Sequence, residues 1–435
     1  MKKILAIVLA LCMVFALCAC GQKAAPAAAP AAAPAAAPAA DANADVTNLT
    51  MWCIATESDS NRHSYEAAIA DVTKAHPEIN FTWEAFENQS YKTKIKAAVA
   101  ADEMPDIFFT WSCAFLGDFV DAGRVYCMDE IYKDFAKELP AVMMGNVCYG
   151  GSYYGVPLTM NIVAMFANME ILKNAGYDEV PGTYEEFVKC CDDLKSQGII
   201  PFGCAGSETW CVTEYLEPII EKSVGADTLN DLFLGRATWA NDDVAAAVDT
   251  FQSLVNNGYF DPEGVALTND EVKANFMAGK YAFYQNGTWN CADFAGNADF
   301  GPKVQVSEFP VINADKSQLG ELIGGPSDTL AVAASSPNAE VAARFCFELG
   351  KEICHYGYLD GCGLPAWTPY YDCSSINPLT QTVSDIVANS KTLVLFGDTA
   401  QNADDANIYL EYVAQVYGSV INGAEFVKGL ANDIR

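Results

Sequence analysis

Basic residues are scarce in this chain of 435 residues, whereas acidic residues are abundant. The sequence has 25 Lys and Arg against 56 Asp and Glu, which gives a formal net charge of −31. Because basic side chains that neutralise phosphates supply most of the affinity for nucleic acids, the composition excludes a nucleic acid as the expected partner. The hydrophobic fraction of 51% is enough for a sizeable core, and the length suggests two or three compact units.

The chain also lacks the residue patterns of metal sites and of common enzymes. Its only histidines are His63, His76 and His355, and no two cysteines have the Cys-x-x-Cys spacing. We therefore expect no metal site and no cofactor. The patterns His-Glu-x-x-His and Gly-x-Ser-x-Gly are absent, and a P-loop is excluded because Ala274 occupies the place of its first glycine before Lys280. These absences argue against an enzyme.

The first residues have the pattern of a sorting signal. Lys2 and Lys3 precede an apolar stretch, residues 4–16, which has the length of a secretory signal and is too short to span a membrane. The sequence Leu17-Cys18-Ala19-Cys20-Gly21 resembles the lipobox of bacterial lipoproteins, in which the cysteine receives diacylglycerol. We expect residues 1–20 to be a lipoprotein signal peptide and Cys20 to carry the lipid, palmitate included. The alternative is a plain signal peptide.

An alanine-rich tract follows, with Pro26, Pro30, Pro34 and Pro38 at every fourth position. Such a composition cannot form a packed core, and the prolines favour an extended, semi-rigid chain of about 3 Å per residue. We interpret residues 21–45 as a linker that holds a folded domain away from a membrane, the alternative being a tolerated low-complexity insertion.

Sixteen cysteines would suggest disulfides in an exported protein, but three of them belong to the signal and the anchor. The thirteen that remain are an odd number and are scattered. We interpret most of them as small buried hydrophobic residues. Cys190 with Cys191, and the group Cys354, Cys362 and Cys373, stay open as disulfide partners.

From Val46 onward the hydrophobic pattern alternates between strands and helices. It predicts strands over 48–55, 79–85 and 106–110, with helices over 60–75 and 91–101 between them. This β-α-β-α-β order favours a parallel or mixed sheet with a ligand site at the carboxyl ends of its strands. Further segments are a helix from the capping box at Thr183 to Gln197, a strand over 199–202, a helix over 241–256, and a strand over 281–284 before a turn at Asn286-Gly287.

Short motifs with a fixed order and spacing extend over about Leu49 to Val427. They are Met104-Pro105-Asp106-Ile107, Tyr154-Gly155-Val156-Pro157, Thr183-Tyr184-Glu185-Glu186-Phe187, Phe276-Met277-Ala278-Gly279-Lys280-Tyr281-Ala282, Asn286-Gly287-Thr288-Trp289 and Ser336-Pro337-Asn338-Ala339-Glu340. In this order they resemble the family 1 extracellular solute-binding proteins of bacterial ABC importers, which include sugar-binding lipoproteins.

The resemblance implies an α/β, two-lobed periplasmic-binding-protein-like fold of the class II type, with the ligand cleft between the lobes. With crossings near Leu158, Phe309 and Cys362, the N-terminal lobe would comprise 46–158 and 320–362, and the C-terminal lobe 162–318 and 366–435.

The function that the resemblance implies is capture of an extracellular mono- or oligosaccharide and its delivery to the permease subunits of an ABC transporter. Hinge closure around the ligand would be the state that the permease recognises. We expect a monomer in the cell envelope, outside the cytoplasm, that is anchored to the membrane by its lipid.

Other functions remain as alternatives. Two carboxylates such as Glu57 and Glu208, facing each other across a cleft, would also suit a surface glycoside hydrolase or another carbohydrate-active lipoprotein. A purely structural or adhesive lipoprotein would not need a hinged cleft.

Aromatic platforms and planar polar groups suit a sugar, which presents apolar C–H faces and rings of hydroxyls. Trp111 and Trp289 match places where sugar-binding relatives have stacking aromatics. Trp210 follows a predicted strand, and Trp367 follows the third crossing. The alternative for each tryptophan is a place in the core.

The polar candidates lie in predicted loops and near the crossings. Asp328 is the first choice, because Gly324 and Gly325 before it would let the backbone approach a ligand closely. The others are Glu57, Asp59, Asn88, Asn161 and Glu208.

Overall fold

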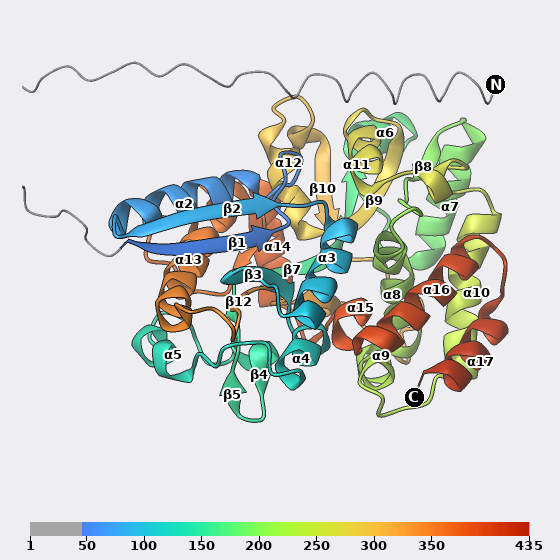
Figure 1. The fold of residues 1–435 in the computed structure, drawn as a ribbon. Coiled ribbons are helices and arrows are strands. Elements are labelled where there is room, and N and C mark those ends of the chain that lie inside the picture. Colours follow the sequence, from blue (N-terminus) through green and yellow to red (C-terminus); the bar gives the residue numbers. More distant parts are fainter. Residues whose placement is uncertain (1–45, 435) are drawn as a thin grey trace, which may run out of the picture. The chain divides into compact units, whose positions relative to one another are not determined.

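Two β-sheets organise the computed structural model, which describes residues 46–434 (Figure 1). The expected signal peptide (1–20), the lipid site Cys20 and the linker 21–45 lie outside the described residues. Among the described helices, none has the length and the hydropathy that crossing a membrane requires.

The first sheet has the strand order β2-β1-β3-β12-β6 and, with its helices, forms the first lobe. β1, β2 and β3 are parallel, whereas β12 and β6 are antiparallel to their neighbours. The strands are β1 (Thr47–Cys53), β2 (Ile79–Ala85), β3 (Ile107–Trp111), β6 (Val156–Pro157) and β12 (Asp328–Val332), and the helices are α2 (Arg62–Ala75), α3 (Asn88–Ala101), α4 (Ala114–Asp121), α5 (Asp129–Phe135) and α13 (Ala339–Asp360). The predicted β-α-β-α-β order is confirmed.

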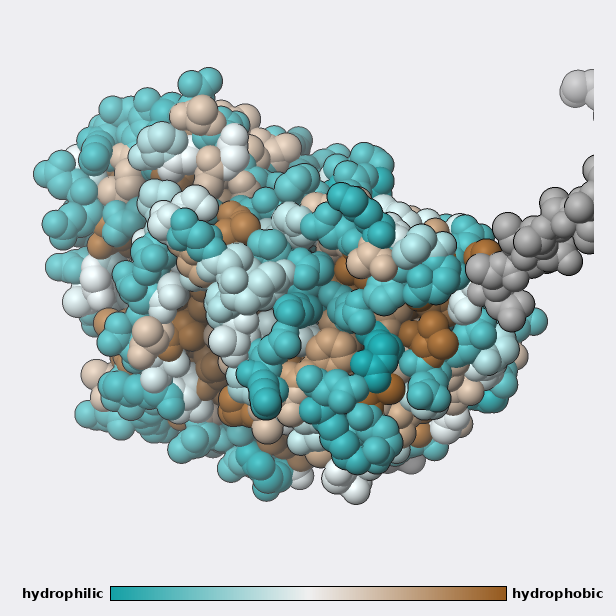
Figure 2. Space-filling model, turned by 90° about the vertical axis from the view of Figure 1, so that its left-hand side faces the viewer, coloured by the Kyte–Doolittle hydropathy of each residue, from teal (hydrophilic) through white to brown (hydrophobic). Residues whose placement is uncertain are grey.

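Helices α2 and α13 lie side by side in the first lobe although they are far apart in the sequence (Figure 1). The apolar face of α2 is buried: Tyr65, Ile69 and Val72 enter the core at helical spacing. A short hairpin of β4 (Cys148–Tyr149) and β5 (Ser152–Tyr153) precedes β6. On the face shown in Figure 2, hydrophilic residues predominate and apolar ones are interspersed among them.

The second sheet has the order β14-β11-β7-β9-β8, and β10 and β13 also pair with β7. Its strands are β7 (Thr159–Asn168), β8 (Ile200–Phe202), β9 (Tyr281–Gly287), β10 (Val304–Ser307), β11 (Glu321–Gly325), β13 (Leu364–Pro365) and β14 (Thr392–Val394). The helices of this second lobe are α6 (Met169–Asn174), α7 (Tyr184–Ser196), α8 (Trp210–Val224), α9 (Ala226–Phe233), α10 (Asp242–Asn256), α11 (Asn269–Met277), α12 (Cys291–Gly296), α14 (Pro378–Ala388), α15 (Gly397–Ala400), α16 (Ala403–Tyr417) and α17 (Gly423–Asp433).

All ten residues of β7 are buried, because helices cover both faces of the second sheet. Side chains alternate along a strand, so Val163, Met165 and Ala167 enter one hydrophobic core, whereas Ala164 and Phe166 enter the other. The first lobe has a core of its own. The structure is therefore a two-lobed α/β fold.

The chain passes between the two sheets three times. It crosses at Leu158, between β6 and β7; at residues 326–327, between β11 and β12; and at residues 361–363, between α13 and β13. The second crossing was expected near Phe309, which instead is buried in a core of the second lobe. β11 pairs with β7 after that point, so the chain leaves the second sheet later than expected.

Two local predictions have opposite outcomes. The capping box at Thr183 is confirmed, with Thr183 accepting a hydrogen bond from the backbone N–H of Glu186. The turn predicted at Asn286-Gly287 is wrong, because β9 continues to Gly287, paired with β7 through that residue.

The thirteen cysteines between residues 46 and 434 are all free, and nine of them are buried. The interpretation as small hydrophobic residues therefore holds for most of them. Neither the adjacent Cys190 and Cys191 nor the group Cys354, Cys362 and Cys373 forms a disulfide.

Gly324→Ala should destabilise the protein by about 2–4 kcal/mol, because the site combines backbone strain with a steric clash. Gly324 has φ +139°, and a Cβ there would lie 2.3 Å from the carbonyl oxygen of Asn161 on β7. Urea unfolding measures the change. Gly182→Ala, with nothing within 4 Å of an added Cβ, serves as the control and should change stability by under about 0.5 kcal/mol. Equal effects of the two substitutions would contradict the clash.

Candidate functional site

A cavity of about 660 Å³ lies between the two lobes. In the first lobe its wall is formed by the loop after β1, the start of α3, the end of β3 and the start of β12. In the second lobe the wall is formed by the start of α8, the start of α11, and α15. The carboxyl ends of β1 and β3 thus open into it, as expected for a sheet of this kind. Its size is that of a small-molecule site.

Aromatic rings from both lobes line the cavity. Trp210 and Trp289 have ring centroids 6.1 Å apart, and Phe396 continues the row with its centroid 6.4 Å from that of Trp289. Trp111 contributes an indole from the end of β3. Gly287 makes the Trp289 position possible, because a Cβ at residue 287 would lie 2.0 Å from that ring.

Lys92 connects the lobes at the cavity wall. Its ammonium lies 4.8 Å from the centre of the Trp111 ring and 3.1 Å from a carboxylate oxygen of Asp398 on α15. Both side chains of this ion pair are less than one quarter exposed. The only lining cation among the described residues is thus already paired.

Two aspartates of the first lobe, Asp59 and Asp328, share one part of the wall. Burial raises the pKa of Asp59, although the backbone N–H and the side-chain amide of Asn61 donate to it at 2.8 and 3.2 Å. Burial, followed by the charge of Asp59, raises the pKa of Asp328 to about 7. The wall can therefore present one of these carboxyl groups as a hydrogen-bond donor near neutral pH.

Glu214 lies on the first turns of α8 and is only 3% exposed. Among the described residues its Oε2 atom finds no hydrogen-bond partner, although the residue lines the cavity. Burial, followed by the charges of Glu217 and Asp398, raises the pKa of Glu214 well above its usual range. The sequence analysis missed this residue, because its only signal is its place one turn after Trp210.

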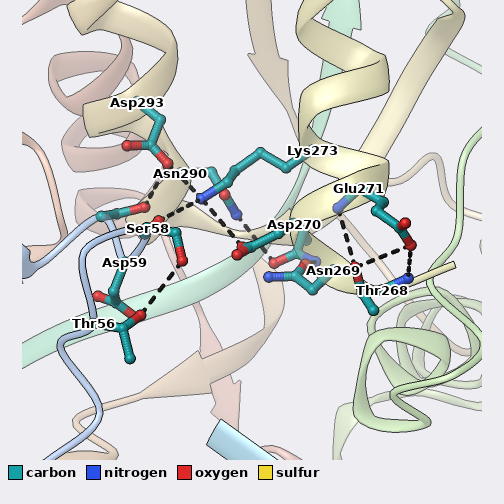
Figure 3. A network of polar contacts seen from close by, with 12 residues as sticks. Thr56, Ser58, Asp59, Thr268, Asn269, Asp270, Glu271, Lys273, Asn290 and Asp293 are labelled. Atoms are coloured by element: carbon teal, nitrogen blue, oxygen red, sulfur yellow. Dashed lines mark hydrogen bonds and ion pairs between the residues drawn. The ribbon is translucent and has the colours of Figure 1, made fainter. Parts of the chain in front are cut away.

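A polar network joins the lobes beside the cavity (Figure 3). Lys273 on α11 donates to Asp293 on α12 at 2.7 Å and to the backbone carbonyl of Ser58 in the first lobe at 3.4 Å. Ser60 donates its hydroxyl to the same Asp293 at 2.8 Å. Asp293 thus receives donors from both lobes.

Seven of the residues named from the sequence line the cavity: Trp111, Trp210, Trp289, Asp59, Asn88, Glu208 and Asp328. Glu208 accepts from the indole N–H of Trp210 at 3.2 Å and from the backbone N–H of Asn269 at 2.8 Å. The Oδ1 atom of Asn88 has no hydrogen-bond partner in the described part of the chain. Lining residues that the sequence analysis did not name include Glu87, Lys92, Glu214, Asp270, Phe396 and Asp398.

Three named residues lie outside the cavity. The Glu57 side chain is 87% exposed and pairs with Arg62 at 2.8 Å. Asn161 is buried in β7, where its amide donates to the carbonyl of Cys362 at 3.2 Å. Trp367 is buried in the first lobe and donates its indole N–H to the carbonyl of Pro157 at 2.9 Å.

Residues 58–346 match the family described as bacterial extracellular solute-binding protein. A solved structure from a study of xylan utilisation by the thermophilic bacterium Caldanaerobius polysaccharolyticus is 32% identical, with a TM-score of 0.85 and coverage of 89% of this chain and 100% of that chain. The multiple sugar-binding protein of Streptococcus mutans is 23% identical over 354 residues, 78% of this chain and 79% of that protein. The melibiose/raffinose/stachyose-binding protein MelE of Bacillus subtilis is 22% identical over 314 residues, 70% of this chain and 71% of that protein.

Asp328→Asn should stabilise the ligand-free protein more at pH 8 than at pH 4. The folded-state pKa of about 7 lies above the ordinary aspartate value, so the folded wild type binds more protons than the unfolded chain, and this carboxyl lowers stability as the pH rises from about 4 to 7. Asparagine removes that penalty, which is on the order of 2–4 kcal/mol. Urea unfolding at both pH values measures the effect, with the exposed Asp178→Asn as control. A gain that is the same at both pH values would contradict the raised pKa.

Proposed function

This chain belongs to the family of bacterial extracellular solute-binding proteins, and we propose that it captures a mono- or oligosaccharide between its lobes and delivers it to the permease of an ABC importer. The observation that carries the proposal is the cavity lining, which combines the rings of Trp111, Trp210, Trp289 and Phe396 with carboxyl and amide groups. Such rings stack on the C–H faces of a sugar, and the polar groups can bind its hydroxyls.

The relatives support the same ligand class. The two curated relatives carry sugars in their names, and the 32% identical structure comes from work on xylan. A cavity of about 660 Å³ has room for more than one sugar ring, since small-molecule sites range over about 300–1,000 Å³.

We propose a binding protein rather than a glycoside hydrolase. The pair considered from the sequence, Glu57 and Glu208, is not assembled, because Glu57 is exposed and lies outside the cavity. The family is one of binding proteins, which also supports a role without catalysis.

The proposed location is the outer face of a membrane, to which Cys20 would be anchored by its lipid while residues 21–45 act as a stalk. The sequence Leu17-Cys18-Ala19-Cys20-Gly21 supports the anchor. We propose a monomer, since capture, closure and delivery each need one two-lobed unit.

A screen of the purified protein against xylo-oligosaccharides, melibiose, raffinose, stachyose and maltotriose tests the function. A sugar present at 100 times its dissociation constant should raise stability by about 2.7 kcal/mol, seen as a thermal shift and then measured by calorimetry. Absence of a shift with every saccharide, together with a shift from a non-sugar solute, would reject the carbohydrate.

Trp289→Ala should weaken binding of the best sugar by about 5- to 150-fold, because it removes a stacking contact worth roughly 1–3 kcal/mol. The loss of stability should be smaller than the about 3–5 kcal/mol typical of a core tryptophan. Trp83→Ala is the matched control, because Trp83 lies on β2 outside the cavity, where its ring packs against the guanidinium of Arg62. Large destabilisation of the Trp289 variant with native affinity would identify Trp289 as a core residue.

Cys20→Ala should release the protein from the membrane or leave its precursor uncleaved, because the thiol that carries the lipid is gone. Membrane fractionation and palmitate labelling of cells that produce either form measure this. Unchanged membrane association with normal labelling of the variant would disprove the anchor site.

A further inference from the structure

We propose that the cavity selects uncharged saccharides over acidic ones, and that the buried Glu214 carboxyl is the group that binds a ligand hydroxyl. The inference rests on the proposed carbohydrate function and specifies its substrate class. It concerns a residue on a helix in the second lobe that no motif singled out.

The charge of the cavity lining is the first argument. In the described part of the chain, seven carboxyl groups line it: Asp59, Glu87, Glu208, Glu214, Asp270, Asp328 and Asp398. Lys92, the lining cation, is held by Asp398 at 3.1 Å, and nearby Lys273 is held by Asp293 at 2.7 Å. A uronic acid or a phosphorylated sugar would therefore lose its hydration without gaining a free cation, and it would meet like charges.

The unpartnered oxygen of Glu214 is the second argument. The carboxyl group of Glu217, one turn further along α8, has hydrogen-bond donors within the protein. The backbone N–H of Gly397 donates to it at 3.1 Å, and the Tyr409 hydroxyl donates to it at 3.2 Å. Glu214 is almost equally buried, yet residues 46–434 supply no hydrogen-bond partner for its Oε2 atom. A buried oxygen without a donor is costly unless another molecule supplies one.

The chemistry of that carboxyl fits a hydroxyl group. The charges of Glu217 and Asp398 act with burial to favour its protonated form. A protonated carboxyl both donates and accepts, as a sugar hydroxyl does, so the two can satisfy each other. A ligand carboxylate could only accept, and its charge would add to the negative charge already present.

Matched sugar pairs test the selectivity by calorimetry. They are xylotetraose with and without a glucuronic acid branch, and melibiose, raffinose and maltotriose with their C6-oxidised uronates. In any pair whose neutral member binds, the acidic member should bind with an affinity at least about 100-fold lower. Equal or tighter binding of the acidic member would overturn the inference and leave carbohydrate capture standing. Binding of no member of any pair would reject both.

Substitutions at residue 214 test its role against a structural one. Glu214→Gln keeps a donor and an acceptor, so the neutral sugar should bind within about 5-fold of wild type. Glu214→Leu should weaken that sugar by about 10- to 100-fold while the ligand-free protein becomes no less stable, since an unsatisfied buried carboxyl is removed.

Glu221→Leu is the matched control. Glu221 lies on the same helix and is 1% exposed, but it lies outside the cavity, and both of its oxygens have partners: Oε2 pairs with the Lys222 ammonium at 3.2 Å, and Oε1 accepts from the Ser317 hydroxyl at 3.1 Å. Its loss should lower stability and leave sugar affinity unchanged, because it breaks a buried ion pair. If Glu214→Leu behaves in the same way, with native affinity and lower stability, Glu214 is a structural residue and the inference fails.

Discussion

Burial of β7 is the constraint on which the rest of the structure depends. A strand with no exposed residue must find partners for its backbone N–H and C=O groups within the protein. β7 finds them in β9, β10, β11 and β13, which come from widely separated parts of the chain. Two of these partners lie directly beside a crossing: β11 precedes the second, and β13 follows the third. The hydrogen-bonding demand of one strand therefore brings the three crossings together, and the cavity lies between the lobes that they join.

The cores allow the cavity to keep polar groups that have no hydrogen-bond partner among the described residues. Glu214 belongs to a helix whose neighbouring residues Val212, Tyr215 and Leu216 are packed in the large core of the second lobe. That packing holds the carboxyl at the cavity wall without a donor to its Oε2 atom from the described residues, at a cost that hydrophobic burial offsets. Asp328 is held in a similar way by the pairing of β12 with β3. Polar groups that are fixed in advance need little rearrangement when a ligand arrives.

The sequence predicted features that depend on a local pattern of residues. It was less informative about features that depend on contacts between distant parts of the chain. A place after a predicted strand led to Trp210, the family resemblance led to Trp111, and the capping box located α7 correctly. Asn286-Gly287 has the local signal of a turn, but pairing with β7 keeps both residues in β9. A tryptophan gives the same sequence signal in a cavity as in a core. The sequence therefore could not distinguish Trp367, which lies in a core, from Trp289, which lines the cavity. Asp398 reaches the cavity because the segment after β14 packs against α8. No local sequence pattern predicts that packing.

The contacts between the lobes are of a kind that leaves closure to the ligand. Lys273 donates to a backbone carbonyl of the first lobe at 3.4 Å, the Ser60 hydroxyl donates to Asp293 at 2.8 Å, and Lys92 pairs with Asp398 at 3.1 Å. Single hydrogen bonds and ion pairs typically contribute about 0–1.5 kcal/mol each, because they replace equivalent contacts of the same groups with water in the open state. A ligand at 100 times its dissociation constant contributes about 2.7 kcal/mol, more than any one of them. The contacts between the lobes are thus weak enough for ligand binding to determine whether the lobes are open or closed. In the proposed function, the permease would distinguish these two states.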